Sequence, residues 1–316
     1  MSMAGSNNMV SGSELIGRAL ALEGVKNVFT IAGDHVLPAL DSMADMGFRF
    51  VDTRHEQAAA HMADAWGRIT GEPGVAMYTT PGFSNAIPGL ANAMHSESPL
   101  LSISGSAELS ELGRGAMQEI DQVGMARPVT KGAWMVTDTR RIPDMIAHAL
   151  RVAYSGRRGP VHLTIPVDIQ QNVVSEDEVA FYEPGEYRGI GAAQASQSDI
   201  EQAIAILREA KRPLIVAGSA ASYARAGEAV QEFIETTRLP LLTEGDARGM
   251  VSDEHAYCLG FFDQGLSQTS RKIREADVVM MLGRKQDLII GYAMSPTIAP
   301  DAKIIQVDPS EAEIGR

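Results

Sequence analysis

The segment TRHEQAAAHMADAWGR, residues 53–68, places a carboxylate where it could transfer protons. Glu56 follows an expected strand and begins an expected helix, so it would lie at the edge where parallel α/β sheets bind ligands. The alternative role is structural, because an acid in the first turn of a helix stabilises the helix dipole by roughly 0.3–1 kcal/mol. The alanines at 58–60 allow another backbone or subunit to approach closely. Burial by that approach would let Glu56 exchange a proton with a ring nitrogen.

Two other expected strands end in small or polar residues that could converge with Glu56. These residues are Gly33, Asp34 and His35 after the strand at 27–33, and Thr80, Pro81, Gly82 and Asn85 after the strand at 74–80. Free N–H groups in a tight turn at a helix start can bind a polar ligand. Taken singly, the first group is more typical of a helix cap, and Pro–Gly after a strand is common. Jointly, the three strand ends predict one ligand site.

The other reactive residue types form no recognised pattern. The segment GRGAMQEIDQ, residues 113–122, contains Gln118 and is expected to be a surface loop after a strand. The single cysteine, Cys258, has no neighbouring His/Asp pattern, and the seven histidines show no HExxH or paired spacing. A zinc site is therefore not expected, and the phosphate-binding P-loop and the GxSxG motif are both absent.

Short apolar runs alternate with amphipathic segments, which predicts an α/β protein with parallel sheets. Helices are expected at 11–24, 36–47, 56–71, 82–96 and 140–156, and strands at 27–33, 48–54, 74–80, 99–105 and 159–168. After a polar, aperiodic stretch, the alternation restarts with helices at 199–210, 227–237 and 270–276 and strands at 213–218, 240–245, 277–283 and 303–308. We expect a flexible tail at 1–9, two doubly wound domains at 10–174 and 198–316, and a linker at 175–197.

Composition limits the partners and the compartment. A formal net charge of −13 without a basic cluster argues against nucleic acid as a ligand. No run approaches the roughly 20 apolar residues of a membrane span, and the N-terminus lacks the features of a signal peptide. One cysteine excludes an internal disulfide and fits a reducing cytoplasm.

The second domain contains two weak nucleotide-binding signals. The segment VAGSAASYARAGEAV, residues 216–230, has the strand–turn–helix order of a nucleotide site but lacks the GxGxxG spacing. Asp308 ends the strand IIQVD, where a carboxylate could accept hydrogen bonds from a ribose or an adenine. An ordinary strand-end aspartate is an equally good interpretation.

Taken in order, these segments resemble the thiamine diphosphate enzymes that include acetolactate synthase, oxalyl-CoA decarboxylase and 2-hydroxyacyl-CoA lyase. The resemblance covers the pyrimidine-binding and central domains of that superfamily and is most specific in RHEQAAAHMADAWGRITGEPGVAM. It implies that Glu56 bonds N1′ of the aminopyrimidine and drives formation of the C2 ylid, so that the cofactor performs the carbanion chemistry.

The resemblance also implies roles for other residues of the first domain. Gly33, Thr80, Pro81, Gly82 and Asn85 would contact the pyrimidine side of the cofactor, and Val36, Phe83 and Met117 would line the substrate pocket. Gln118, with Asp34 or His35, would orient the substrate oxygen or shuttle protons. The implied reaction is cleavage of a C–C bond in a 2-hydroxyacyl-CoA, oxalyl-CoA or 2-oxo acid substrate.

Two branches of the superfamily remain open for the second domain. The pattern around Tyr223 resembles the branch that binds CoA or ADP, whereas acetolactate synthase has FAD there. The implied ligand contacts are Gly218, Tyr223, Arg284, Lys285 and Asp308. The chain departs from the CoA branch by reading GFFDQ and GRKQDL in place of the usual segments, with Arg284 and Lys285 as possible phosphate-binding charges.

The superfamily binds the cofactor diphosphate through Mg²⁺ in a third domain, using a Gly–Asp–Gly motif and a later asparagine. No asparagine follows Asn172 in this sequence. We therefore expect no metal ligand in these residues, a diphosphate-binding domain or partner subunit outside them, and no turnover by this chain alone. The resemblance implies a homodimer or a tetramer. The alternative of another class is a non-catalytic half of a split enzyme.

Overall fold

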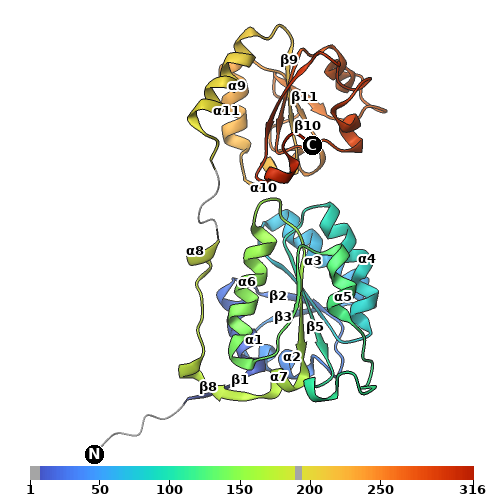
Figure 1. Ribbon diagram of the computed structural model, residues 1–316, viewed down its shortest axis with the longest axis vertical. Coiled ribbons are helices and arrows are strands. Elements are labelled where there is room, and N and C mark those ends of the chain that lie inside the picture. The colour runs from blue at the N-terminus through green and yellow to red at the C-terminus, as the bar shows by residue number, and fades with distance from the viewer. Residues whose placement is uncertain (1–7, 189–193) are drawn as a thin grey trace, which may run out of the picture. The chain divides into compact units, whose positions relative to one another are not determined.

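The computed structural model describes residues 8–188 and 194–316, which form two compact units divided at Ile190 (Figure 1). Each unit is a parallel sheet covered by helices. This confirms the expected α/β class with two doubly wound domains. The region expected as a linker contains a 3-10 helix at Glu176–Glu178 and the short helix α8 (Pro184–Tyr187), and its residues 189–193 lie outside the described part.

The first unit is built on six parallel strands in the order β3-β2-β4-β5-β7-β6. This order reverses direction beside β2, which creates the switch point where open α/β sheets bind ligands. The strands are β2 (Asn27–Thr30), β3 (Arg49–Asp52), β4 (Gly74–Tyr78), β5 (Leu100–Ser106), β6 (Ala133–Met135) and β7 (Val161–Pro166). All residues of β4, β5 and β7 are buried, as expected for central parallel strands.

Helices cover both faces of this sheet (Figure 1). On one face, apolar residues of α1 (Gly12–Leu22), α2 (Leu37–Asp45) and α6 (Ile142–Tyr154) form a core with the sheet. On the other face, small residues of α3 (Glu56–Thr70), α4 (Gly82–His95) and α5 (Gln122–Ala126) form a second core. The short helix α7 (Val167–Gln171) follows β7.

The chain enters the first unit through a two-stranded antiparallel ribbon that the sequence analysis did not anticipate. Strand β1 (Met9–Ser11) pairs with β8 (Val173–Ser175). Met9 therefore belongs to a strand, although it was expected in the flexible tail. Ser11 then caps α1, because its hydroxyl accepts a hydrogen bond from the Glu14 backbone N–H at 3.2 Å.

The second unit has five parallel strands in the order β11-β10-β9-β12-β13. They are β9 (Pro213–Ala217), β10 (Leu241–Thr243), β11 (Cys258–Phe261), β12 (Val278–Leu282) and β13 (Lys303–Val307), with helices α9 (Gln197–Glu209), α10 (Ser219–Tyr223) and α11 (Gly227–Thr237). Edge strand β11 was not predicted, and the helix expected at 270–276 is a 3-10 helix, Thr269–Glu275. Within residues 8–188 and 194–316, no helix has the length and apolar character needed to cross a bilayer.

Strand β4 lies so close to α3 that its first position has room only for glycine. A Cβ added to Gly74 would lie 1.9 Å from the Ala63 carbonyl oxygen, and a backbone atom cannot rotate away as a side chain can. We expect Gly74→Ala to lower the free energy of unfolding by roughly 1–3 kcal/mol through overpacking, measured by urea denaturation.

The control for this prediction is Gly185→Ala in α8. A Cβ at Gly185 meets no atom within 4 Å, so this variant should keep its stability within about 0.5 kcal/mol. Equal stability of the two variants would contradict the close approach of β4 to α3.

Candidate functional site

Glu56 is the first residue of α3 and lies one turn beyond the end of β3. Thr53 continues the pairing with β2 through a backbone hydrogen bond from its N–H to the Thr30 carbonyl at 3.1 Å. His55 then takes an extended conformation and caps the helix, because its Nδ1 accepts from the Gln57 N–H at 3.2 Å. The parallel pairing and the cap together fix the position of Glu56 at the carboxyl edge of the sheet.

The carboxylate of Glu56 lies against the first turn of α4. Its Oε2 accepts a hydrogen bond from Asn85 Nδ2 at 3.0 Å. A Cβ added to Gly82 would lie 2.5 Å from Glu56 Oε1, so the absence of a side chain at Gly82 makes room for the carboxylate. The structure therefore brings together three residues that the sequence analysis selected from two separate segments, Glu56, Gly82 and Asn85.

Helices α3 and α4 stay in register through a polar contact about two turns further along. Asp64 is buried on α3, and its carboxylate accepts from Asn92 Nδ2 of α4 at 2.6 Å. The guanidinium of Arg68 pairs with the same carboxylate at 3.0 Å. Because helices are stiff, this contact also fixes the spacing of Glu56 and Asn85 at the helix starts.

The segment after β2 is held close to the segment after β4. His35 is buried, and its Nδ1 lies 2.8 Å from the Thr79 hydroxyl. Burial lowers the pKa of His35, and the neighbouring Asp34 carboxylate opposes that shift. Gly33 also packs on Thr79, since a Cβ at Gly33 would lie 2.5 Å from its methyl group. His35 and Asp34 do not cap α2, which begins after Val36 without a side-chain cap.

The remaining predicted residues of the first unit lie at different depths. Asp34 is exposed beside an open cleft, and Met117 and Gln118 are exposed in the segment between β5 and α5. Val36 and Phe83 are fully buried, the first in the core beneath α2 and the second at the start of α4. Thr80 is buried, and its hydroxyl has no hydrogen-bond partner within the described residues.

A buried polar network near Phe83 was missed by the sequence analysis. His162 of β7 is fully buried, and its Nδ1 lies 2.9 Å from Ser102 Oγ, which accepts a hydrogen bond from the Tyr78 hydroxyl at 3.0 Å. The signal was the alternation of polar residues in two strands that are otherwise apolar, PLLSISG and GPVHLTIP. Polar residues of period two in a buried strand all point to the same face of the sheet.

The second unit gathers its predicted ligand residues at the carboxyl edge of its sheet. The residues are Gly218 after β9, Tyr223 at the end of α10, Arg284 and Lys285 after β12, and Asp308 after β13. Gly218 packs directly on Arg284, because its Cβ would lie 2.8 Å from Arg284 Cα. Tyr223 donates to Asp246 at 3.0 Å, and Asp308 accepts from the Ser310 N–H at 3.0 Å.

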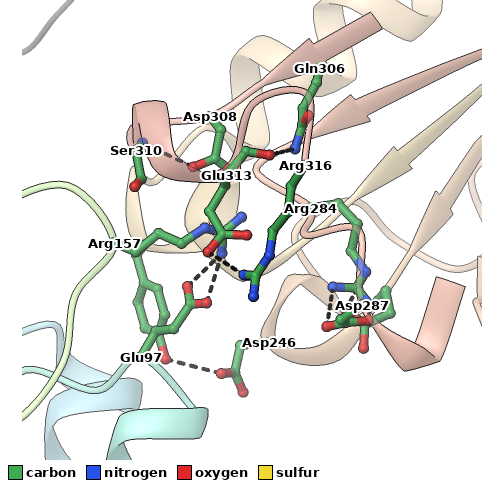
Figure 2. Close-up of polar contacts among 12 residues, drawn as sticks. Glu97, Arg157, Asp246, Arg284, Asp287, Gln306, Asp308, Ser310, Glu313 and Arg316 are labelled. Atoms are coloured by element: carbon green, nitrogen blue, oxygen red, sulfur yellow. Dashed lines mark hydrogen bonds and ion pairs between the residues drawn. The ribbon is translucent and has the colours of Figure 1, made fainter. Parts of the chain in front are cut away.

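Arg284 is buried and its charge is balanced by two carboxylates. Its Nε lies 3.1 Å from Glu244 Oε2. Its Nη1 donates to Asp287 Oδ2 at 2.9 Å, a contact that Figure 2 shows. The predicted phosphate contact of Arg284 stays a prediction, and any phosphate there would compete with these carboxylates. Within the described ranges, no group of three His, Cys, Asp or Glu side chains has the arrangement of a metal site.

Comparison with known proteins identifies both units. Residues 10–125 match the family described as thiamine pyrophosphate enzyme, N-terminal TPP binding domain, and residues 200–316 match the central domain of the same enzymes. The first match includes β2 to β5, and the second includes all five strands of the second sheet.

Relatives of two kinds are similar at nearly the same level. Human 2-hydroxyacyl-CoA lyase 1 is 33% identical over 311 residues, which cover 98% of this chain and 52% of the relative. The large subunit of acetolactate synthase isozyme 1 from Escherichia coli K12 is 34% identical over 310 residues, or 97% of this chain and 54% of the relative. A probable acetolactate synthase large subunit from Methanocaldococcus jannaschii is 32% identical over 311 residues (97% and 52%). This chain spans about half the length of these relatives.

The buried His162 predicts a dependence of stability on pH. Burial lowers the pKa of His162 from 6.5 to about 3. Between these values the unfolded chain binds a proton and the folded chain does not, so stability falls as pH falls from about 6.5 towards 3, by up to about 1.4 kcal/mol per pH unit. The variant His162→Asn does not titrate, so we expect a flatter dependence of its unfolding free energy on pH, measured in urea.

Carboxylates titrate in the same range, so the comparison requires a control. His95→Asn changes an exposed histidine at the end of α4 and should leave the slope of the wild-type curve unchanged. The same slope in wild type and His162→Asn would show that His162 is protonated in the folded state, contrary to this prediction.

Proposed function

This chain belongs to the thiamine pyrophosphate enzyme family, and we propose that the complete protein is a thiamine-diphosphate-dependent C–C lyase. The proposed substrates are 2-hydroxyacyl-CoA or related 2-oxo acid and oxalyl-CoA compounds. The observation that carries the proposal is the placement of Glu56, whose carboxylate meets Gly82 and Asn85 at the carboxyl edge of the first sheet. The similarity to 2-hydroxyacyl-CoA lyases along nearly the whole chain supports the substrate class.

The residues around Glu56 fit an aminopyrimidine ring. When bound, thiamine diphosphate would supply a carbanion centre that attacks a carbonyl, so that the adjacent C–C bond can be cleaved. Glu56 would hold a proton at a pyrimidine ring nitrogen, while Asn85 keeps the carboxylate oriented by donating to its other oxygen. Gly82 makes room for the Glu56 carboxylate, and the Thr80 hydroxyl has no hydrogen-bond partner within the described residues, so it would be a further polar group of this turn. Cis-Pro81 shapes the turn between these two residues.

We propose that the exposed residues beside this site contact the substrate. Asp34 and Gln118 follow the ends of β2 and β5, so both belong to the same edge of the sheet as Glu56. His35 would act through its bond with Thr79, because its buried ring favours the neutral form that can donate or accept one proton. Met117 would contribute exposed apolar surface, whereas Phe83 is fully buried and would support the start of α4 from within the core.

Binding of the cofactor diphosphate is proposed to lie outside residues 1–316. The curated relatives are about twice as long as this chain, which leaves room in the complete protein for a diphosphate- and Mg²⁺-binding domain. We further propose a homodimer or tetramer, with Glu56 of one subunit facing a cofactor bound by another, in the cytoplasm.

The second candidate is an acetolactate synthase-like transferase with FAD in the second unit, and the acetolactate synthase relatives favour it. The two candidates differ in colour and in ligand. A lyase of the CoA branch should be purified colourless and should release an aldehyde from a 2-hydroxyacyl-CoA. A yellow protein whose visible spectrum is that of FAD would exclude the CoA proposal and leave the transferase.

The role of Glu56 can be tested directly in the complete protein. The variant Glu56→Gln keeps the size of the side chain and removes its acid–base function. We expect exchange of the C2 proton of bound thiamine diphosphate with D₂O to slow by roughly 10²–10⁴-fold, measured by quenched-flow NMR, with unchanged circular dichroism.

The control is Glu72→Gln, which alters an exposed glutamate just beyond the end of α3. In this variant the C2 proton of bound thiamine diphosphate should exchange at the wild-type rate. If Glu56→Gln also exchanges at the wild-type rate, Glu56 does not activate the cofactor.

A further inference from the structure

The polar network beneath the start of α4 has a definite direction of hydrogen bonding. Tyr78 donates to Ser102 Oγ, so the Ser102 hydroxyl is free to donate to His162 Nδ1 at 2.9 Å. With the proton assigned to Nε2, His162 donates to Thr164 Oγ1 at 3.0 Å or to Ser104 Oγ at 3.3 Å. Strong burial keeps the imidazole neutral, which is the form that this arrangement requires.

The network contacts the Glu56 site through Phe83. The rings of His162 and Phe83 lie 4.1 Å apart at 32°, and the Tyr78 ring lies 6.3 Å from Phe83 on another side. Phe83 stands between Gly82 and Asn85, the two residues that contact the Glu56 carboxylate. Its N–H also donates to the Thr79 carbonyl at 2.9 Å, which closes the turn before α4. Phe83 therefore packs on the buried network and belongs to the same turn as the residues that contact Glu56.

We propose that His162 is a positioning residue that, through Phe83, fixes Gly82 and Asn85 against the Glu56 carboxylate. The role of Glu56 as a proton-transfer group rests on the function proposed above, whereas the fixed geometry of the turn does not. His162 is separated from the carboxylate by Phe83 and acts through it.

The physical basis is the directionality of hydrogen bonds. An apolar side chain at position 162 could fill the same space in several rotamers, because dispersion contacts are not directional. A buried imidazole with both nitrogens bonded has one allowed ring plane, and a satisfied buried network makes a core more rigid. The ring plane of His162 in turn sets the position of Phe83. Tyr78 and Glu56 are the ionisable groups near this network, and burial raises the pKa of Tyr78, so it stays a donor.

The first test uses the ligand-free protein. His162→Phe keeps a ring beside Phe83 and removes both nitrogens. We expect hydrogen–deuterium exchange of the backbone amides at 79–86 to speed up by roughly tenfold, or about 1.4 kcal/mol of local opening free energy, measured by mass spectrometry. His162→Asn restores an acceptor near the position of Nδ1 and should recover part of the protection.

A matched control separates this effect from general destabilisation. Val161→Ala removes buried atoms from the neighbouring residue, which faces the opposite core of the sheet and does not contact Phe83. It should lower global stability while leaving exchange at 79–86 unchanged relative to the rest of the unit. Equal protection at 79–86 in wild type and His162→Phe would overturn the proposal.

The second test is a double-mutant cycle in the complete protein with bound thiamine diphosphate. His162→Phe alone should slow C2-proton exchange by between about tenfold and about 100-fold, as expected for a misplaced group. In the Glu56→Gln background the same substitution should have little further effect, because the group that it positions is gone.

The outcomes distinguish this inference from the proposed function. A multiplicative effect of the two substitutions would overturn the positioning role and leave the function of Glu56 intact. A Glu56→Gln variant with wild-type exchange would refute the proposed function, and the amide-exchange test in the ligand-free protein would still decide the role of His162.

Discussion

The close approach of α3 to α4 is the constraint on which the first unit depends. A Cβ at Gly89 would lie 2.6 Å from Ala60 Cβ, and one at Gly82 would meet the Glu56 carboxylate at 2.5 Å. The helices can therefore pack only where small residues face each other, as they do along the alanines of α3. This packing brings the Glu56 carboxylate, which follows β3, to the Asn85 amide, which follows β4. The two groups can meet because both helices start at the same edge of the sheet.

Small residues allow the two helices to approach closely but do not fix their register. Buried polar groups fix the register. Alanine and glycine surfaces can slide along each other at small energetic cost. Breaking the contact of Asp64 with Asn92 would leave the buried carboxylate with Arg68 as its remaining partner, at a cost of about 1–3 kcal/mol. A similar role is played by Gln170, whose amide donates to the His35 and Ile165 carbonyls at 2.7 Å and ties the end of β7 to the segment after β2. The strand ends are thus fixed by directional bonds.

The sequence was sufficient to predict the central elements and the placement of Glu56. Buried parallel strands and amphipathic helices have strong periodic patterns, so β4, β5, β7 and most helices were found close to their observed bounds. Strands β6 and β11 lie at sheet edges and have only three or four residues, too few for a periodic pattern. The His162 network was missed because its hydrogen bonds join β4, β5 and β7, and such pairing depends on register, which one sequence does not reveal.

Charged side chains at the carboxyl edges of the two sheets have different partners. The Glu56 carboxylate is bonded to a neutral amide, Asn85, and to no cation within the described residues. Arg284 is 4% exposed and already neutralised by Glu244 and Asp287, whose side chains are 13% and 42% exposed. Removing one partner from a buried pair is costly, whereas a half-exposed carboxylate can return to water. A phosphate bound to Arg284 would therefore displace the Asp287 carboxylate and leave Glu244 in place. Such binding would require a local rearrangement around Arg284, whereas a ligand at Glu56 would displace no ion-pair partner.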